Sequence, residues 1–194
     1  MDIKKMKKFD HELDYIEAAA SQVENYLLSK ELYRPIGITS RHGEKPFPAL
    51  TIGNLLLATN RAGGFASSTK EKVRLSKIQN EINQIRHRWA AAWQDKLSVE
   101  FSARLKLWSD FLEEYRKEPG LNFDRYRYEV SRRVIIHLLS EQYSHVPDHE
   151  AELLSALDRY LRAMFQSGEF TWDDALEQVF PESVYWYLYG RLPA

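Results

Sequence analysis

The sequence predicts an all-α fold, a helical bundle of six or seven helices around one long central helix. Apolar residues recur at spacings of three and four along most of the chain, which is the rhythm of one face of an α-helix. Proline and glycine gather between these segments rather than inside them. No stretch alternates between apolar and polar residues and ends in hairpin turn residues, so the sequence predicts no β-sheet.

The chain has a length that suits one domain. Residues 1–9 include four lysines, and we expect them to form a flexible basic N-terminus. Residues 10–194 are then expected to form a single all-helical domain. Residues 34–49 contain three prolines and two glycines, which interrupt helices, so this segment is predicted to be the longest loop.

Two helices are expected on either side of this loop. Between His11 and Leu32, five apolar residues fall on one helical face. Residues 50–60 form a short, strongly apolar segment, which predicts a buried helix. We expect this helix to end at Gly63 and Gly64, because glycine favours helix C-termini.

The central helix is predicted to run from Ser68 to Glu118. Ser68 and Glu71 have the spacing of a capping box, in which each side chain accepts a hydrogen bond from the other residue's backbone N–H. Large apolar residues keep the helical rhythm from there to Pro119. A straight helix of this length would span roughly 70 Å. Because the spacing changes to successive fours, a kink or short break near residues 95–98 is plausible.

The C-terminal third is predicted to be helical as well. A fourth helix is expected to run from about Asn122 or Asp124 to Tyr143, and a fifth to begin at Pro147, since proline is tolerated in the first turn. Thr171 is predicted to cap a sixth helix. A last helix, rich in aromatic residues, follows Pro181.

Composition excludes several classes of protein. The chain has no cysteine, so it can hold no disulfide, thiol nucleophile or cysteine-ligated metal. No apolar run approaches the roughly 18 residues that cross a bilayer, and the first residues lack the apolar core of a secretory signal. We therefore expect a cytoplasmic protein that does not enter membranes.

Motifs for cofactors and metals are missing or poorly formed. Neither a Walker sequence nor a Gly-x-Gly-x-x-Gly turn occurs, and no histidine follows a glutamate at the spacing of di-iron bundles. His145 and His149 have the spacing of two ligands on one helical face, but Pro147 lies between them and disturbs that geometry. The sequence therefore predicts no cofactor and no metal site.

Arg132 and His137 are the candidate catalytic residues. Four residues separate them, and this spacing resembles the Arg and His pair of the HEPN family, small all-α ribonucleases. The resemblance covers this one spacing, and Arg133 stands where that family usually has a smaller polar residue. It implies RNA cleavage by Arg132 and His137. The alternative is that Arg132 lies at the surface and that His137 is half-buried or has its ring nitrogens hydrogen-bonded within the fold.

Charge is distributed unevenly along the chain. Residues 1–140 contain 24 basic and 18 acidic side chains, whereas residues 141–194 contain 3 basic and 10 acidic ones. A phosphate-binding surface is one interpretation, and attraction between the two halves is the other. The candidate nucleic-acid-binding residues are Arg74, Lys77, Arg86, Arg88, Arg125, Arg127, Arg132 and Arg133.

Large rings are concentrated near the C-terminus. A single short helix cannot turn all of them toward one interior, so we expect some to be exposed or covered by a partner. The predicted partner interface consists of Tyr185, Trp186, Tyr187 and Tyr189.

These observations favour a non-enzymatic helical scaffold or subunit that acts through protein–protein interaction, self-association included. The predicted central helix is too long for so small a domain to cover, and another chain could cover it. The first alternative is a nucleic-acid-associated accessory protein. The second is a HEPN-like ribonuclease.

Overall fold

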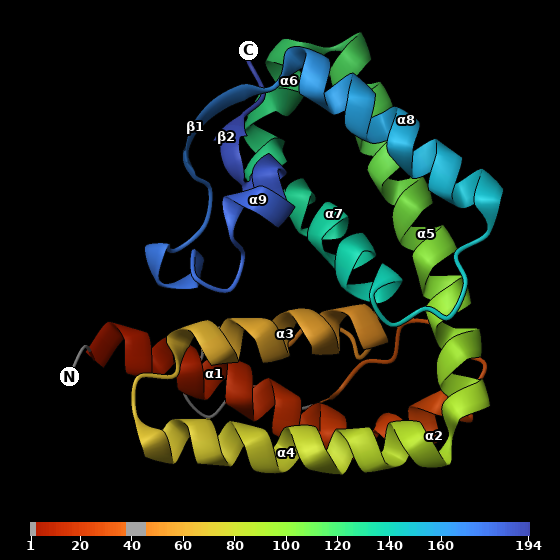
Figure 1. The fold of residues 1–194 in the computed structure, drawn as a ribbon, viewed down its shortest axis with the longest axis vertical. Coiled ribbons are helices and arrows are strands. Elements are labelled where there is room, and N and C mark those ends of the chain that lie inside the picture. Colours follow the sequence, from red (N-terminus) through yellow and green to blue (C-terminus); the bar gives the residue numbers. More distant parts are fainter. Residues whose placement is uncertain (1–2, 38–45) are drawn as a thin grey trace. The chain divides into compact units, whose positions relative to one another are not determined.

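The computed structural model describes residues 3–37 and 46–194 (Figure 1). Residues 10–194 are predicted to form one domain. The contacts instead divide the chain into two compact units, Met1–Glu100 (unit 1) and Phe101–Ala194 (unit 2). Helix α5 runs from one unit into the other.

The prediction of an all-α helical fold is confirmed. Within the described residues, the strands are confined to one antiparallel pair, β1 (Gln166–Phe170) and β2 (Tyr189–Arg191). No helix of this part of the chain has both the length and the apolar character needed to cross a membrane. The helices are α1 (Ile3–Ala20), α2 (Val23–Leu27), α3 (Ile52–Phe65), α4 (Thr69–Arg88), α5 (Ala90–Lys117), α6 (Pro119–Asn122), α7 (Tyr126–Ser140), α8 (Asp148–Met164) and α9 (Glu182–Tyr185).

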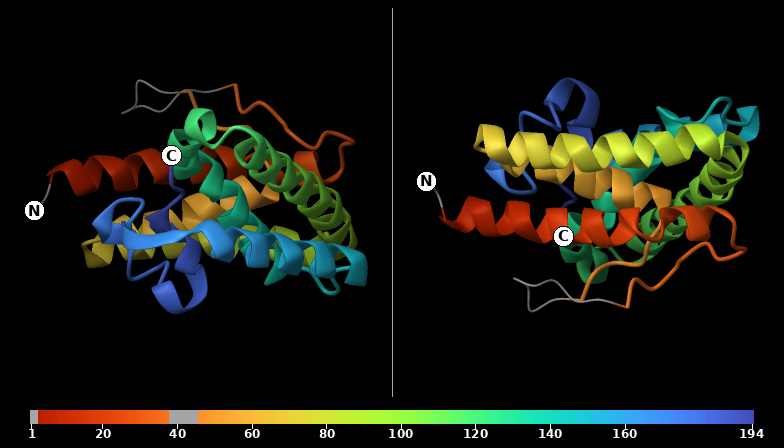
Figure 2. Two further views of the ribbon diagram at one scale, coloured as in Figure 1. Left: turned by 90° about the horizontal axis from the view of Figure 1, so that it is seen from above. Right: turned by 90° about the horizontal axis from the view of Figure 1, so that it is seen from below.

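Unit 1 is built on α1, α3 and α4, which run side by side in Figure 1 and in both views of Figure 2. Helix α1 buries one face, which includes Phe9, Leu13 and Ile16. The predicted flexible terminus at residues 1–9 is wrong from Ile3 onward. Phe9 is buried, and the Lys8 ammonium lies over the Phe65 ring at 5.6 Å, so contacts with the rest of unit 1 favour the helix in this part of the chain.

Helix α3 is longer than predicted. It begins after Thr51, whose side chain accepts a hydrogen bond from the Asn54 backbone N–H. It continues through Gly63 and Gly64 to Phe65, so the predicted stop at the two glycines is wrong. A glycine costs a helix only about 1 kcal/mol, and burial of the Phe65 ring favours continuation. The predicted loop at residues 34–49 lies partly outside the described residues; Arg34 and Leu50 pair across its base.

The capping box at the start of α4 is confirmed. The Ser68 Oγ accepts from the Glu71 N–H at 3.2 Å, and the Glu71 carboxylate accepts from the Ser68 N–H at 2.8 Å. The predicted central helix, however, is two helices that meet at Trp89, where the backbone leaves helical geometry (φ −114°, ψ 40°). The break therefore lies before residues 95–98, where the apolar spacing predicts a kink.

Tertiary contacts explain a break that contains neither proline nor glycine. The Trp89 Nε1–H donates to the Glu24 carboxylate at 3.0 Å, and Arg88 lies 3.7 Å from the same carboxylate. Four residues later Trp93 is buried, and the Lys96 ammonium donates to the Ser29 backbone carbonyl at 2.9 Å. The start of α5 is thus held against α2 and the residues that follow it.

Unit 2 surrounds an aromatic core between α5 and α7. Trp108 and Phe111 of α5 lie within ring-contact distance of Tyr126, the first residue of α7. Helix α8 begins directly after Pro147, which confirms the predicted helix start at this proline. The predicted sixth helix is wrong. Thr171 follows β1, and its hydroxyl donates to the Gly190 carbonyl at 3.1 Å instead of capping a helix.

The close approach of the two strands requires a glycine. Gly190 has φ +150°, and a Cβ at this position would lie 2.1 Å from the Gln166 carbonyl oxygen. The two strands can therefore pair only because residue 190 has no side chain. This requirement fixes the path of the chain before and after the β1–β2 pair.

Candidate binding groove beside helix α8

A buried ion pair joins α7 to α8. The Arg133 Nε donates to one oxygen of the Asp158 carboxylate at 2.8 Å, and Nη2 donates to the other at 2.7 Å. The guanidinium also lies over the Tyr187 ring, 4.5 Å from its centroid. Burial is the largest single influence and acts to lower the pKa of Arg133, but the hydrogen bonds to Asp158, the charge of Asp158 and the nearby Tyr187 and Tyr126 together outweigh it, and the pKa is raised. Arg133 therefore stays charged.

Tyrosines complete this polar cluster. The Tyr126 hydroxyl donates to the Tyr187 backbone carbonyl at 2.6 Å. Burial raises the pKa of Tyr126 and of Tyr187 well above the ordinary value, and raises that of Tyr185 to about 12. All three phenols are therefore neutral at physiological pH, which suits hydrogen bonding rather than proton transfer.

His137 lies at the edge of the cluster. Its ring packs edge-on against Tyr185 at 4.9 Å, and its Nε2 lies 3.5 Å from the Glu141 carboxylate. Burial lowers the pKa of His137, although Glu141 acts in the opposite direction. The structure therefore favours a neutral imidazole that packs inside unit 2.

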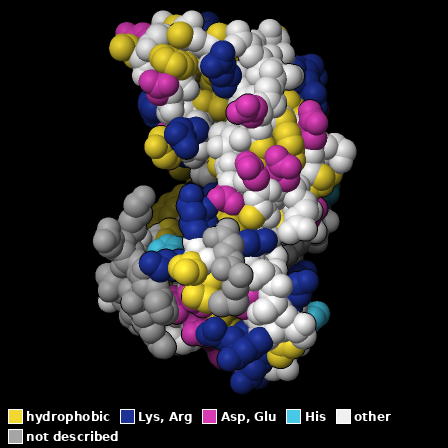
Figure 3. Space-filling view, turned by 90° about the vertical axis from the view of Figure 1, so that its left-hand side faces the viewer, with side chains coloured by type: hydrophobic (Ala, Val, Ile, Leu, Met, Phe, Trp, Pro, Cys, Tyr) yellow, Lys and Arg dark blue, Asp and Glu magenta, His cyan; other side chains and the backbone are white. Residues whose placement is uncertain are grey.

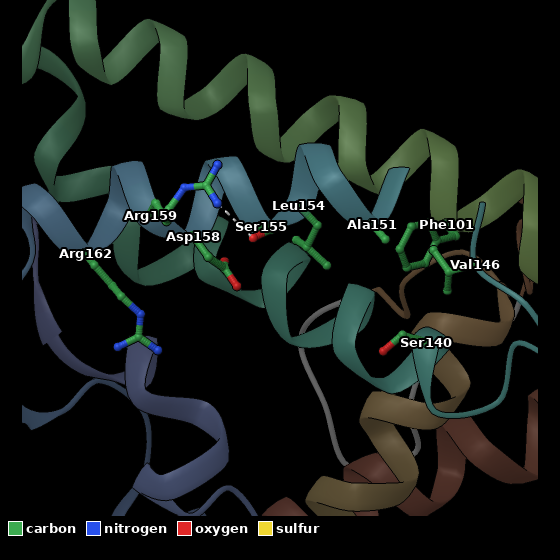
Figure 4. Close-up of a pocket in the computed structure, with 9 residues that line it drawn as sticks. All are labelled: Phe101, Ser140, Val146, Ala151, Leu154, Ser155, Asp158, Arg159 and Arg162. Carbon is green, nitrogen blue, oxygen red and sulfur yellow. Dashed lines mark hydrogen bonds between the residues drawn. The ribbon is translucent and has the colours of Figure 1, made fainter. Parts of the chain in front are cut away.

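A groove of about 410 Å³ opens beside α8, within unit 2. Its lining residues on α8 run from Ala151 to Arg162, a distance of about 16 Å along the helix axis. Figure 4 shows an apolar end formed by Phe101, Val146 and Ala151, with Leu154 projecting between α8 and α7. The other end is charged, and the full lining is Phe101, Ser140, Val146, Ala151, Leu154, Ser155, Asp158, Arg159 and Arg162.

Two arginines give the charged end a positive character. Arg162 stacks on the Trp186 ring, with the guanidinium carbon 3.8 Å from the ring centroid. Arg159 donates to the Ser155 hydroxyl at 3.3 Å. No carboxylate of the described residues forms an ion pair with either guanidinium. Asp158 also lines the groove, but Arg133 occupies both of its oxygens.

The predicted catalytic pair is not brought together. Arg132 and His137 are five residues apart on α7, which places them about 140° apart around the helix axis. Arg132 lies 2.6 Å from the Glu129 carboxylate and donates to the Leu107 carbonyl. Arg133, one turn before His137, is the arginine that shares its face. The geometry therefore gives the HEPN-like hypothesis no additional support.

The unit 1 half of the predicted nucleic-acid-binding surface lies on α4 and comprises Arg74, Lys77, Arg86 and Arg88. Arg74 lies 3.4 Å from the Glu17 carboxylate and 3.8 Å from that of Asp10. Arg88 pairs with Glu24, and Arg86 lies over the Trp93 ring at 5.9 Å. Lys77 is exposed. Most of this half therefore contacts unit 1 itself.

The unit 2 half comprises Arg125, Arg127, Arg132 and Arg133. Arg125 pairs with Glu114 at 2.7 Å and with Glu129 at 3.1 Å. Arg127 is exposed and lies over the Tyr128 ring at 5.5 Å. On the face drawn in Figure 3, basic, acidic and hydrophobic side chains are interspersed. The ion pairs of Arg125 with Glu114 and Glu129 reduce the positive charge that this half could offer to a phosphate backbone.

The aromatic residues predicted as a partner interface mostly pack inside unit 2. Tyr185 and Tyr187 are buried, and Trp186 and Tyr189 are half-buried. The expectation of a single short helix was wrong here, because α9 ends at Tyr185 and a 3-10 turn follows (Tyr185 φ −106°, ψ 42°). The change of direction lets successive rings reach the interior.

His145 precedes α8, and His149 lies in its first turn. The described residues contain no group of three or more histidine and acidic side chains placed to hold a metal ion. Only one of the two histidines therefore lies on a helix.

Comparison of the chain with protein-family models, with curated proteins and with solved structures gave no match.

Sequence reasoning missed the groove and its two arginines. Residues 141–194 contain three basic side chains, and two of them, Arg159 and Arg162, line the groove. The sequence does contain one indication of this site: two arginines three residues apart on a predicted helix, in a segment that is otherwise acidic. Their relation to Trp186 and Phe101 depends on tertiary packing, which the sequence does not display.

Proposed function

We propose that the protein is a non-enzymatic helical subunit that acts by binding another protein chain, a second copy of itself included. The observation that supports this proposal is the incomplete burial of α8. Among its 17 residues, only Glu150 and Leu161 are buried, although its apolar residues share one side of the helix. A soluble helix normally covers such a side.

The exposed side is a flank distinct from the groove. Leu153, Leu157 and Met164 fall within about 40° of one another around the helix axis. Leu153 is 43% exposed, and the other two are half-buried. Leu154 lies about 60° to 100° away from these three residues and lines the groove. An apolar flank on a rigid helix is a common form of contact surface between helical chains.

The residues that line the groove also favour binding over catalysis. The Asp158 carboxylate is held by Arg133, the Ser140 hydroxyl donates to the His137 backbone carbonyl rather than to an imidazole, and the Ser155 hydroxyl accepts from Arg159. A serine needs an adjacent base to act as a nucleophile.

Leu153→Glu is expected to abolish self-association, because it places a charge in the centre of the apolar flank. Sedimentation velocity at micromolar concentrations should show a dimer for the unaltered chain and a monomer for this variant. Leu154→Glu is the matched control, since it makes the same change one residue away and should remain dimeric. A monomeric unaltered chain, or equal behaviour of the two variants, would contradict the proposed contact surface.

A further inference from the structure

We infer that the groove beside α8 binds an elongated aliphatic carboxylate, with its hydrocarbon chain at the apolar end and its carboxylate at Arg162; Arg159 points to the other side of α8 and adds only positive charge nearby (Figure 4). This inference goes beyond the proposed function, because it concerns a small ligand and the opposite flank of α8. The inference uses both the apolar end and the charged end of the groove.

The dimensions favour a small, narrow ligand. A volume of about 410 Å³ lies within the range of roughly 300 to 1,000 Å³ that small-molecule sites occupy. The lining spans about 16 Å along α8. An extended hydrocarbon chain advances about 1.3 Å per carbon, given a C–C bond length of about 1.5 Å, so about 12 carbons match this length.

The walls favour a hydrocarbon over a peptide. The described walls come from helices and the connection before α8, and they offer no strand edge. An extended peptide in such a groove would leave its backbone N–H and C=O groups without partners, which is costly. A hydrocarbon chain has no such groups, and it can pack against Phe101, Val146 and Leu154.

The charged end selects an anion. Asp158 would repel a carboxylate if it were free, but its two oxygens accept hydrogen bonds from Arg133. The net charge that remains on the lining therefore comes from Arg159 and Arg162. Stacking on Trp186 fixes the plane of the Arg162 guanidinium and leaves its N–H edge free to donate to both oxygens of a carboxylate.

The surrounding charge restricts the ligand to one anionic group. Residues 141–194 carry 10 acidic side chains against 3 basic ones. A polyanion would meet this negative field outside the groove, whereas a single carboxylate can reach Arg162. A fatty-acid-like ligand combines one carboxylate with a long apolar chain.

The test is isothermal titration calorimetry of the full chain with dodecanoate, below its micelle concentration. Dodecanoate should bind with one site per chain, and dodecanol, which has the chain without the charge, should bind at least tenfold more weakly. Acetate, which has the charge without the chain, should show no binding. Equal affinity for dodecanoate and dodecanol would overturn the assignment of the charged end.

Variants locate the site. Arg162→Gln is at an exposed position and should fold normally, and it should weaken dodecanoate binding by about tenfold. Leu154→Glu should weaken it at least as much, whereas Leu153→Glu should leave it unchanged. Arg127→Gln, which removes an exposed arginine elsewhere in unit 2, is the charge control and should also leave it unchanged. The inference fails if Arg162→Gln binds like the unaltered chain or if all four variants bind alike.

Discussion

Removal of the Asp158 carboxylate is expected to lower the free energy of unfolding of unit 2 by about 3 to 5 kcal/mol. Asp158→Ala would leave the Arg133 guanidinium buried without its counter-ion. The side chain of Arg133 is 8% exposed, so water cannot replace the two lost hydrogen bonds. Urea unfolding followed by circular dichroism measures the change.

The reverse substitution is expected to cost less. Arg133→Met leaves the Asp158 carboxylate behind, and this side chain is 22% exposed and can be hydrated. Its cost should therefore be about 1 to 3 kcal/mol. The double variant should be less destabilised than the sum of the two single variants, because the lone buried charge is then absent.

Asp110→Ala is the matched control for a carboxylate in an ion pair. Asp110 pairs with Lys106 on α5 at 2.8 Å, but both side chains are well exposed. Exposed pairs contribute less than about 1 kcal/mol, so this variant should change stability little. If Asp158→Ala cost no more than Asp110→Ala, the ion pair would not hold α7 to α8.

Local signals in the sequence predicted two of the helix starts. Ser68 with Glu71, and Pro147 before α8, act through their own turn, so the sequence contains all the partners involved. The break at Trp89 could not be predicted in this way. It depends on Glu24, 65 residues away, and no proline or glycine marks it.

The C-terminal segment shows the same limit. The pairing of β1 with β2 requires Gly190, whose missing side chain admits the Gln166 carbonyl. The sequence around Gly190, at the end of an aromatic run, gives no indication of this strand pairing. The groove also depends on tertiary packing, because Arg162 of α8 stacks on Trp186, which lies far from it in the sequence.

The stability of unit 1 is expected to fall as the pH rises from about 4.5 to 7, through the titration of Glu12. Glu12 lies on α1, and Arg61 lies on the neighbouring helix α3. Burial raises the pKa of Glu12 from 4.5 to about 7, although the charge of Arg61 acts to lower it. Burial likewise lowers the pKa of Arg61.

The sign follows from proton linkage. Between pH 4.5 and 7 the folded chain retains a proton on Glu12 that the unfolded chain has released, so raising the pH favours unfolding. The pKa difference corresponds to about 3 kcal/mol, lost across this range and constant above it. His137 acts in the opposite direction, because its pKa is lowered in the folded state, and stability from this group is lost as the pH falls.

A comparison with Glu12→Gln separates the two groups. The glutamine cannot titrate, so the difference in stability between the unaltered chain and this variant should change by about 3 kcal/mol between pH 4.5 and 8. His137 is present in both chains and cancels. Glu17→Gln, at a more exposed position on the same helix, is the matched control for replacing a carboxylate by an amide. Parallel stability curves for the unaltered chain and Glu12→Gln would show that Glu12 is as well solvated in the folded chain as in the unfolded one.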